Sequence, residues 1–450
     1  MSTSRIVAIA LVSVSASALE AQQRPPVRQI GAVTAQSTEK LASMFTVRPL
    51  SNGSVLVNDI PGRRVLLFNP ELSSFKVVAD STSATGNAYG GRTGSLVAYR
   101  GDSSLFIDPA SVSMLVLDPT GEVARVMAIP RAEDAMVLGG ITGAPAFDGS
   151  GRLVYRAGGG MRMMGRPGGT ATRIVEGNRG GAGPAPGMAP PEIPDSALIV
   201  GVDLSTREVD TLGYIRTPKM KFDIKHDENG GMQMQSMVNP LPIVDDWAVL
   251  PGGTLAFVRG RDYHVDFVDR DGKVTSATKL PFNWQRLTDE DKSAFLDSLK
   301  AARARLGPNA PVPGMPGMTT GGGGGAPQMM VFSQTMTTGP GGGGAPAPSN
   351  RQTMRPTEMQ YVPASELPDY KPAFFAGSTR ADLNGNLWIR TIPTEAIAGG
   401  PVYDVINSKG ELVERVQIPE KRTIVGFGDG VVYLLNSDGA SATLEKAPLR

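Results

Sequence analysis

Short apolar runs alternate with polar turns along most of the chain. One recurring phrase is an apolar triplet, then Asp or Asn, a polar turn and a second strand-like segment, which is typical of a β-hairpin. Its copies are found around Leu66, Leu115, Val200, Asp266 and Asp404. A second phrase is a glycine-bearing turn before a short apolar strand. Its six copies begin at Asn52, Gly101, Gly149, Gly252, Asn384 and Gly428.

Together the two phrases predict four short strands per repeat and six repeats, which is typical of a β-propeller. Three longer segments interrupt the repeats, at about residues 157–195, 215–242 and 281–372. With these segments set aside, about 45 residues remain for each repeat, the usual length of a propeller blade. The sequence therefore predicts an all-β fold in which residues 22–450 form one six-bladed β-propeller domain.

Phrases such as Leu387-Trp388-Ile389-Arg390 give the chain a resemblance to a known family. It resembles the bacterial six-bladed β-propeller superfamily, which includes NHL-repeat and TolB-like proteins. The resemblance covers most of the chain and implies the fold. It leaves the function open, because the superfamily contains scaffolds, binding proteins, lyases and lactonases. Propeller lactonases hold a divalent metal near the axis with Glu, Asp and Asn, and no corresponding motif is recognisable in this sequence.

The N-terminus has the features of an export signal. Arg5 precedes an apolar stretch over residues 6–14, and small residues follow as far as Ala21. This pattern predicts a cleavable signal peptide at residues 1–21, and hence a periplasmic or secreted protein. The apolar stretch is too short for a transmembrane segment, and no cysteine is present to carry a lipid anchor.

The last repeat is one strand short. We expect residues 27–33 to supply its missing outer strand, because such closure removes an exposed sheet edge. The alternative is that residues 24–40 are a frayed tail.

The three interrupting segments all fall between second and third strands or between blades, so they should elaborate one face of the ring. In the longest segment, Thr288 and Asp291 form a capping pair before an apolar stripe at helical spacing. This predicts one helix, either packed on the propeller surface or docking a partner. Residues 307–360 are rich in Gly, Pro and Met and predict a disordered linker. A similar loop over 158–191 suggests an adaptable contact surface, with thioether copper binding as the less favoured alternative.

Composition excludes several kinds of chemistry. The net charge of +1 gives no electrostatic signature for nucleic acid. The absence of cysteine excludes disulfides, thiol nucleophiles and thiolate metal sites. No phosphate-binding loop or Gly-x-Ser-x-Gly motif occurs, so we predict no cofactor, no metal site and no catalytic residue. Asp245 and Asp246 are interpreted as a solvated acidic turn at a strand entrance.

The candidate binding residues are those at the end of the second strand of each predicted blade. These positions should all lie at the same height around the central channel of the propeller. They are Asp59 with Asn58, Asp108, Arg156, Arg259, Arg390 and Asn436. The three arginines could hold a small anionic ligand, because a guanidinium matches carboxylate and phosphate. The alternative is that arginines and aspartates neutralise one another. His264 in blade 4 is interpreted as a structural or partner-contacting histidine rather than a general base.

The sequence is compatible with two functions. The first is an exported, non-enzymatic binding module that recognises a ligand, polymer or protein partner on the insertion-bearing face. The second is a propeller enzyme, either a metal-assisted hydrolase such as a lactonase or a lyase, with its site at the central mouth. The missing hydrolase motifs and the scarcity of histidine favour the first.

Overall fold

The structure is a computed structural model. It describes residues 24–41, 46–60, 62–80, 94–141, 143–158, 194–219, 221–226, 232–306, 360–395, 398–437 and 441–449. The predicted signal peptide, the predicted linker at 307–360 and the methionine-rich loop over 158–191 lie almost entirely outside these residues.

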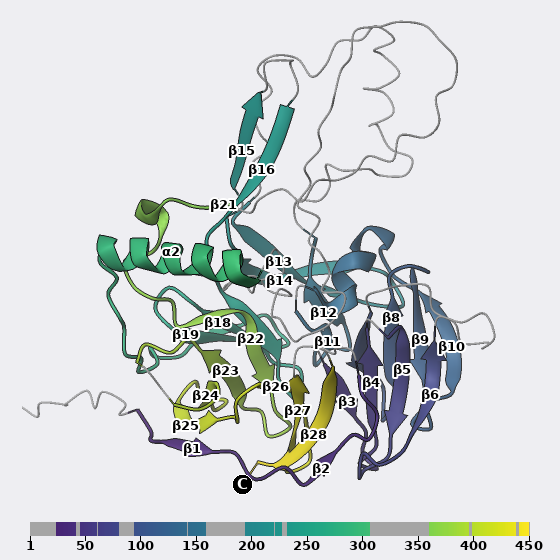
Figure 1. Cartoon of the computed structure of the whole chain (residues 1–450). Coiled ribbons are helices and arrows are strands. Elements are labelled where there is room, and N and C mark those ends of the chain that lie inside the picture. Colours follow the sequence, from purple (N-terminus) through teal and green to yellow (C-terminus); the bar gives the residue numbers. More distant parts are fainter. Residues whose placement is uncertain are drawn as a thin grey trace, which may run out of the picture.

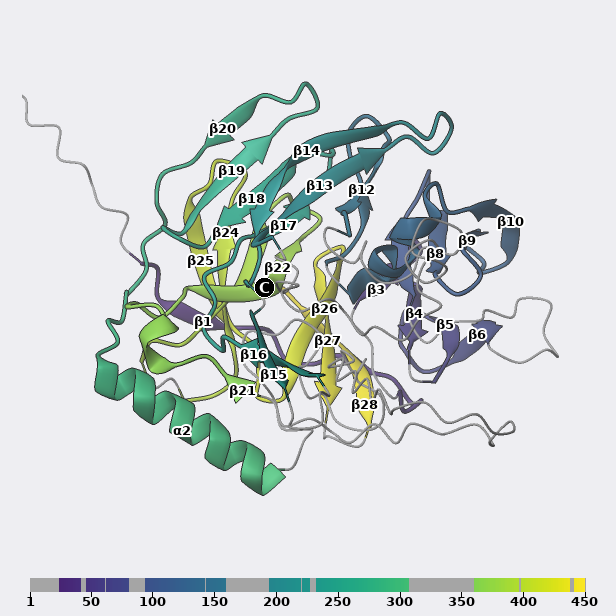
Figure 2. The same ribbon diagram turned by 90° about the horizontal axis from the view of Figure 1, so that it is seen from above.

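The chain is a six-bladed β-propeller. Six sheets stand around a common axis, each with its first strand innermost (Figures 1 and 2). The first three blades are β3 (Val47–Pro49), β4 (Val55–Asp59), β5 (Arg64–Phe68) and β6 (Phe75–Asp80); β7 (Ser95–Ala98), β8 (Ser104–Asp108), β9 (Ser113–Leu117) and β10 (Val123–Ala128); and β11 (Ala146–Phe147), β12 (Leu153–Arg156), β13 (Ser196–Val202) and β14 (Val209–Arg216).

The last three blades complete the ring in chain order. They are β17 (Asp246–Val249), β18 (Leu255–Arg259), β19 (His264–Val268) and β20 (Val274–Ser276); β22 (Phe374–Ala381), β23 (Leu387–Thr391), β24 (Val402–Ile406) and β25 (Leu412–Gln417); and β26 (Arg422–Gly428), β27 (Val431–Ser437) and β28 (Ala442–Pro448). Between blades 2 and 3 lie two short helical turns, η1 (Ala132–Asp134) and η2 (Val137–Ile141). The predicted six-bladed architecture is confirmed.

The N-terminal segment supplies two outer strands rather than one. β2 (Ala35–Gln36) pairs antiparallel with β28 and is the outer strand of blade 6. β1 (Val27–Gln29) instead pairs parallel with β25 and makes blade 5 five-stranded. The prediction that an N-terminal strand completes the last blade is therefore right in kind but misplaced by several residues. The reason is burial: Ile30 enters the apolar cluster between blades 5 and 6, which fixes residues 27–29 on blade 5.

The core consists of apolar layers between neighbouring blades. Between blades 3 and 4, Val154 and Ile199 pack against Trp247 and Phe257. Gly213 in β14 allows this contact, because a Cβ atom there would lie 2.5 Å from the Phe257 ring. Such close packing fixes the relative positions of side chains on adjacent blades.

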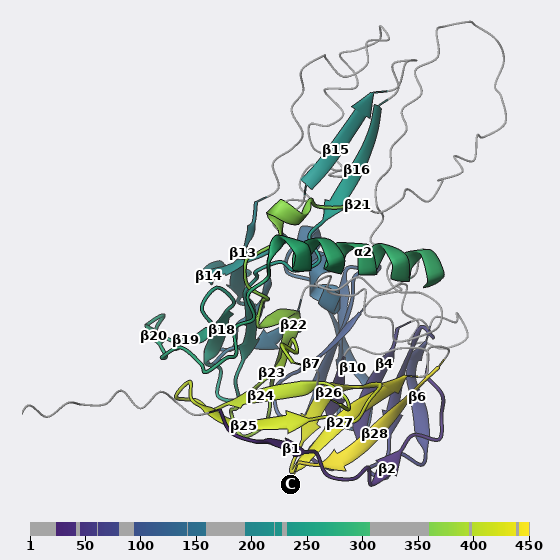
Figure 3. The ribbon, with the colours of Figure 1, turned by 60° about the vertical axis from the view of Figure 1, so that its left-hand side comes forward.

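The insertions elaborate one face, as Figure 3 shows most clearly. The connection from blade 3 to blade 4 contains β15 (Lys221–His226) and β16 (Met232–Val238), a hairpin that stands away from the ring. The next connection contains α2 (Asp289–Leu306), β21 (Gln360–Tyr361) and η4 (Ala364–Glu366). β21 extends the hairpin through β16.

The predicted helix and its cap are confirmed. The Thr288 N–H donates to Asp291 Oδ2 (2.9 Å), and the Asp291 N–H donates to Thr288 Oγ1 (3.2 Å). α2 packs its Leu296 against Val362 and Leu367 of the insertion itself. The helix is thus covered by the chain's own inserted segment, whereas the sequence placed it on the propeller surface or against a partner. None of the helices in the described part is long and apolar enough to cross a membrane.

Candidate functional site

All the predicted candidate positions except His264, the first residue of β19, lie at or near the end of the second strand of a blade. Arg156 and Arg259 are the last residues of β12 and β18, and Arg390 is the penultimate residue of β23. At this end of the channel the first strands begin and the insertions are attached. We call it the insertion-bearing mouth. The structure nevertheless gives the charged side chains different environments.

The two candidate aspartates are occupied within their own turns. Asp59 is 1% exposed, and its Oδ2 accepts a hydrogen bond from Arg64 Nε at 3.0 Å. Asp108 is equally buried and accepts from the Ala110 N–H (3.1 Å) and the Ser111 hydroxyl (2.6 Å). Both carboxylates therefore stabilise the turn between the second and third strands.

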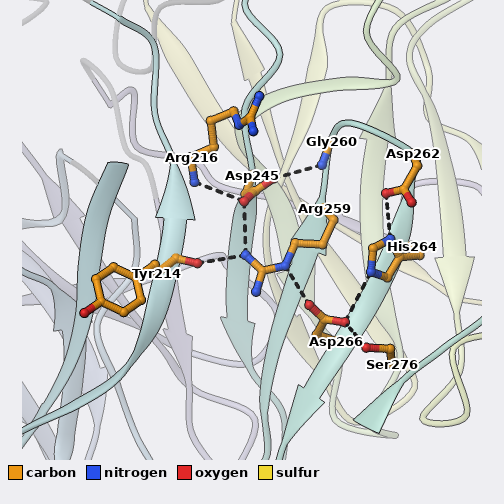
Figure 4. Close-up of polar contacts among 9 residues, drawn as sticks. All are labelled: Tyr214, Arg216, Asp245, Arg259, Gly260, Asp262, His264, Asp266 and Ser276. Atoms are coloured by element: carbon orange, nitrogen blue, oxygen red, sulfur yellow. Dashed lines mark hydrogen bonds and ion pairs between the residues drawn. The ribbon is translucent and has the colours of Figure 1, made fainter. Parts of the chain in front are cut away.

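Arg259 is fully engaged between blades 3 and 4 (Figure 4). Its Nε donates to Asp266 Oδ2 at 2.7 Å, and its Nη1 donates to Asp245 Oδ2 at 3.0 Å and to the Tyr214 carbonyl at 2.7 Å. The guanidinium carbon also lies 4.9 Å from the centroid of the Phe257 ring. For Arg259 the neutralisation alternative fits the geometry.

Asp245 lies beside the end of β14, the outer strand of blade 3. It accepts hydrogen bonds from the Arg216 N–H (3.0 Å) and the Gly260 N–H (3.1 Å) as well as from Arg259. Gly260 is needed here, because a Cβ atom would lie 1.9 Å from the Val244 carbonyl oxygen. The interpretation of Asp245 and Asp246 as a solvated acidic turn is wrong. Asp245 is partly buried and Asp246 is buried, because strands of neighbouring blades enclose both.

His264 extends this network on the same blade. Its Nδ1 lies 2.7 Å from Asp262 Oδ1, and its Nε2 lies 3.2 Å from Asp266 Oδ1, so both ring nitrogens face carboxylates (Figure 4). The Ser276 hydroxyl donates to the same Asp266 oxygen at 2.6 Å. Burial alone would raise the pKa of Asp266. The hydrogen bonds from Ser276 and Arg259, with the charges of Arg259 and His264, lower it below its usual range.

A groove of about 420 Å³ opens beside this network, between β14 and blade 4. Its lining includes Tyr214, whose side chain is largely exposed, and Phe257. The ionisable side chains Asp245 and Arg259 also reach the groove, but both are committed to ion pairs and hydrogen bonds. The groove therefore offers contact area more than reactive groups.

Arg156 is partly buried at the end of β12. Its strongest favourable electrostatic neighbour is Asp246, and burial lowers the pKa of the Arg156 guanidinium more than that carboxylate raises it. Asp246 is 6% exposed and accepts the Thr379 N–H from β22 at 2.8 Å. Burial raises the pKa of Asp246. The hydrogen bonds from Thr379 and the charge of Arg380 lower it, but they do not cancel the rise.

The inner strand of blade 5 is irregular at this point. In β22, Phe374 pairs with Thr391 and Thr379 with Ile389, so the residues between them bulge out opposite Arg390. The Arg380 guanidinium folds over the bulge and donates to the Gly377 carbonyl at 3.0 Å and the Thr379 carbonyl at 2.8 Å. Bulges of this kind often redirect side chains next to functional sites.

Arg380 and Arg390 share one electrostatic neighbour. Burial raises the pKa of the Tyr403 hydroxyl, and the charges of Arg390 and Arg380 oppose that rise. Arg390 is exposed and lies opposite Tyr403 in the β23–β24 ladder. Arg156 and Arg380 thus both act electrostatically on Asp246, and Arg380 and Arg390 both act on Tyr403.

We call Arg156, Arg380 and Arg390 the mouth arginines. Within the part of the chain that the structure describes, none of the three has a carboxylate within ion-pair distance, and Asp246 is the buried acid nearby. Arg259, the third arginine predicted from the sequence, lies outside this group. Arg380 was missed, because only the ends of second strands were considered. Asp246 begins β17, whereas Arg380 is the penultimate residue of β22, so no single rule about strand ends would have found both.

Comparisons with known proteins find only distant similarity. No protein-family model matches the chain, and no curated protein matches it by sequence. Among solved structures it is similar to a gluconolactonase from Xanthomonas campestris, with 11% identity over 94% of this chain and 97% of the other and a TM-score of 0.36.

Two further structures are similar to the same degree. Virginiamycin B lyase from Staphylococcus aureus has 9% identity over 92% of this chain and 97% of its own, with a TM-score of 0.37. Regucalcin, a calcium-binding protein from Agrobacterium tumefaciens, has 10% identity over 94% and 98%, with a TM-score of 0.38. Likeness at this level carries no argument about activity. In the described residues of this chain, no group of three His, Asp or Glu side chains is arranged to hold a metal ion.

Proposed function

We propose that this protein is an exported, non-enzymatic binding module that holds a small anionic ligand at the insertion-bearing mouth of the propeller. The ligand contacts Arg156 and Arg390, and Arg380 supports the site from the bulge of β22. Export rests on the predicted signal peptide at residues 1–21, and the partner class is a small molecule carrying carboxylate or phosphate.

The observation that carries this proposal is the charge balance at the mouth. Arg156 from blade 3 and Arg380 from blade 5 both act electrostatically on one buried carboxylate, Asp246, which is already hydrogen-bonded to Thr379. Arg390 adds an exposed positive charge near the end of β23. A guanidinium in a partly desolvated site gains more from an anion than it would in water. Its planar fork also matches a carboxylate or phosphate with two parallel hydrogen bonds.

The neighbouring ionisable groups support binding over catalysis. Arg259, Asp245 and Asp266 are joined to one another, and both nitrogens of His264 face carboxylates. A general base needs a free acceptor within reach of the substrate proton. No such acceptor is left in this network.

The test uses thermal unfolding of the mature protein with inorganic phosphate and with citrate, at constant ionic strength set by sodium chloride. We expect at least one anion to raise the melting temperature in a saturable manner, because binding to the folded state alone stabilises it. A variant carrying both Arg156→Gln and Arg390→Gln should lose this shift. Arg380 is left intact, since its bonds to Gly377 and Thr379 support the backbone.

Two control variants separate the site from general charge effects. Arg270→Gln with Lys273→Gln removes two exposed positive charges from the β19–β20 turn and should leave the anion shift unchanged. Arg259→Gln should lower the melting temperature of the free protein but preserve the shift. No response to either anion, or an undiminished response in the Arg156/Arg390 variant, would overturn the proposal. Conversion of an offered lactone or ester would support the enzyme alternative instead.

A further inference from the structure

The N-terminal segment, residues 24–30, lies along the outer edge of blade 5 (Figure 1). In β1, Val27 pairs with Arg415, Arg28 with Val416 and Gln29 with Gln417, all in the parallel sense. The Ile30 N–H adds a hydrogen bond to the Gln417 carbonyl at 3.1 Å. Blade 5 has its four strands without β1, so this fifth strand is an addition to a complete sheet.

The ring is closed by a different part of the chain. β2 supplies the fourth strand of blade 6, and Leu41 makes a further bridge to Ala442. Residues 31–33 connect this closure to β1, and Ala32 and Val33 are exposed. The N-terminal segment is therefore separate from the closure of the propeller.

Side-chain contacts hold the segment along its length. At its C-terminal end, Ile30 is 8% exposed and packs with Trp388 and Val416. In between, Arg28 pairs with Glu414, and Gln29 Nε2 donates to Gln417 Oε1 at 2.5 Å.

At the N-terminal end, the Arg24 guanidinium carbon lies 5.8 Å from the centroid of the Phe282 ring, in blade 4's connection to blade 5. Its charge also acts on Asp404, a buried acid between these blades. Asp404 is fully buried, and its Oδ2 accepts the Tyr263 hydroxyl at 2.9 Å.

The acid near Arg24 is only partly compensated by its fixed neighbours. Arg415 Nε is 3.4 Å from Asp404 Oδ1, and that oxygen has no hydrogen-bond partner. Burial raises the pKa of Asp404, while the Tyr263 hydrogen bond and the charges of Arg415 and Arg24 lower it. Arg24 thus brings a second positive charge to a buried carboxylate that needs one.

We propose that the outer edge of blade 5 is a peptide-binding site, and that residues 24–30 occupy it as a detachable ligand. The mode is strand addition, in which backbone hydrogen bonds give affinity and side-chain pockets give specificity. The Asp404–Tyr263–Phe282 site selects arginine, and the blade 5–6 cluster selects an aliphatic residue six positions later. The predicted signal cleavage near Ala21 places the mature N-terminus just before this arginine, which frees the segment to bind.

The experiment uses the full mature chain with a specific protease site inserted between Ala32 and Val33. After folding, the chain is cut, and retention of the N-terminal fragment is measured by native mass spectrometry. A fluorescent synthetic peptide of residues 22–32 is then added, and its exchange into the cut protein is followed by anisotropy. We expect the fragment to stay bound without a covalent link and the labelled peptide to replace it at a one-to-one ratio.

Peptide variants test the two pockets. Arg24→Ala should weaken binding of the peptide by at least tenfold, because it removes one of the two positive charges that act on the buried Asp404. Arg28→Gln is the matched control and should change peptide binding by less than about fivefold, because its ion pair with Glu414 is only partly buried and involves no fully buried charge. Loss of the fragment on cutting without rebinding of peptide would overturn the proposal. Unfolding of the cut protein would also overturn it, since the segment would then be an integral part of the propeller.

Discussion

The Thr379 N–H donates a hydrogen bond to Asp246 Oδ2 over 2.8 Å, and this bond joins the inner strands of blades 4 and 5 at the insertion-bearing mouth. The acceptor is buried, and the donor belongs to the strand that bulges opposite Arg390. One carboxylate therefore has both a structural role between two blades and an electrostatic role beside the mouth arginines.

Replacing Asp246 by Asn should reduce the loss of unfolding free energy that the parent protein shows as the pH rises. Burial raises the pKa of Asp246, so the folded state binds this proton more tightly than the unfolded state. The resulting stabilisation is complete below the ordinary carboxyl pKa and is lost as pH rises through the raised value. Asp246→Asn keeps an oxygen for the Thr379 N–H and has no proton to lose. Denaturant unfolding at stepped pH should show a smaller loss of unfolding free energy in the variant over that interval.

The same variant should strengthen anion binding at the mouth, because it removes the acid on which Arg156 and Arg380 act. Phosphate or citrate should then raise the melting temperature at lower concentrations than in the parent protein. Weaker anion binding in Asp246→Asn would show that this carboxylate orients the arginines instead of competing for them.

Replacing Asp266 by Asn should have the opposite pH signature. The pKa of Asp266 is lowered, despite its burial, by Ser276, Arg259 and His264. Its stabilisation is present above the ordinary carboxyl pKa and is lost as pH falls through the lowered value. Asp266→Asn should cost about 1–3 kcal/mol at neutral pH, since it weakens hydrogen bonds to charged partners. The difference from the parent should shrink in acid, and a constant difference at every pH would contradict the assignment.

Gly260→Ala should destabilise the junction of blades 3 and 4. The added Cβ atom would collide with the Val244 carbonyl oxygen, which is backbone and cannot rotate away. We expect a loss of about 1–3 kcal/mol in unfolding free energy, in the range of overpacking substitutions. Gly158→Ala is the control, because its Cβ atom would meet only ordinary contacts at 3.4 Å or more. Equal effects of the two substitutions would refute the steric account.

N-terminal sequencing of the exported protein should place the mature start near Ala21 or Gln22. The physical basis is the run of small residues after the short apolar stretch. An intact Met1 would contradict the signal-peptide prediction. It would also remove the argument that export frees the N-terminal segment for blade 5.

The sequence by itself determined the repeat, the strands and the turns, because each depends on residues close together in the chain. In the β5–β6 turn, for example, Asn69 Oδ1 accepts the N–H groups of Ser73 and Ser74. In the β9–β10 turn, Asp118 Oδ1 likewise accepts those of Thr120 and Glu122. Such contacts span five residues or fewer, so the pattern of Asn, Asp and Gly reveals them.

Only the tertiary structure decided which charges meet. The sequence could place Arg156, Arg259 and Arg390 at one height, since strand ends follow from the repeat. It could not show that Arg259 turns to Asp245 and to the Tyr214 carbonyl, 45 residues away in the chain. Nor could it bring Arg24 to Asp404, or assign residues 27–29 to blade 5. The packing of whole sheets around the axis brings these groups together, and no local pattern encodes that packing.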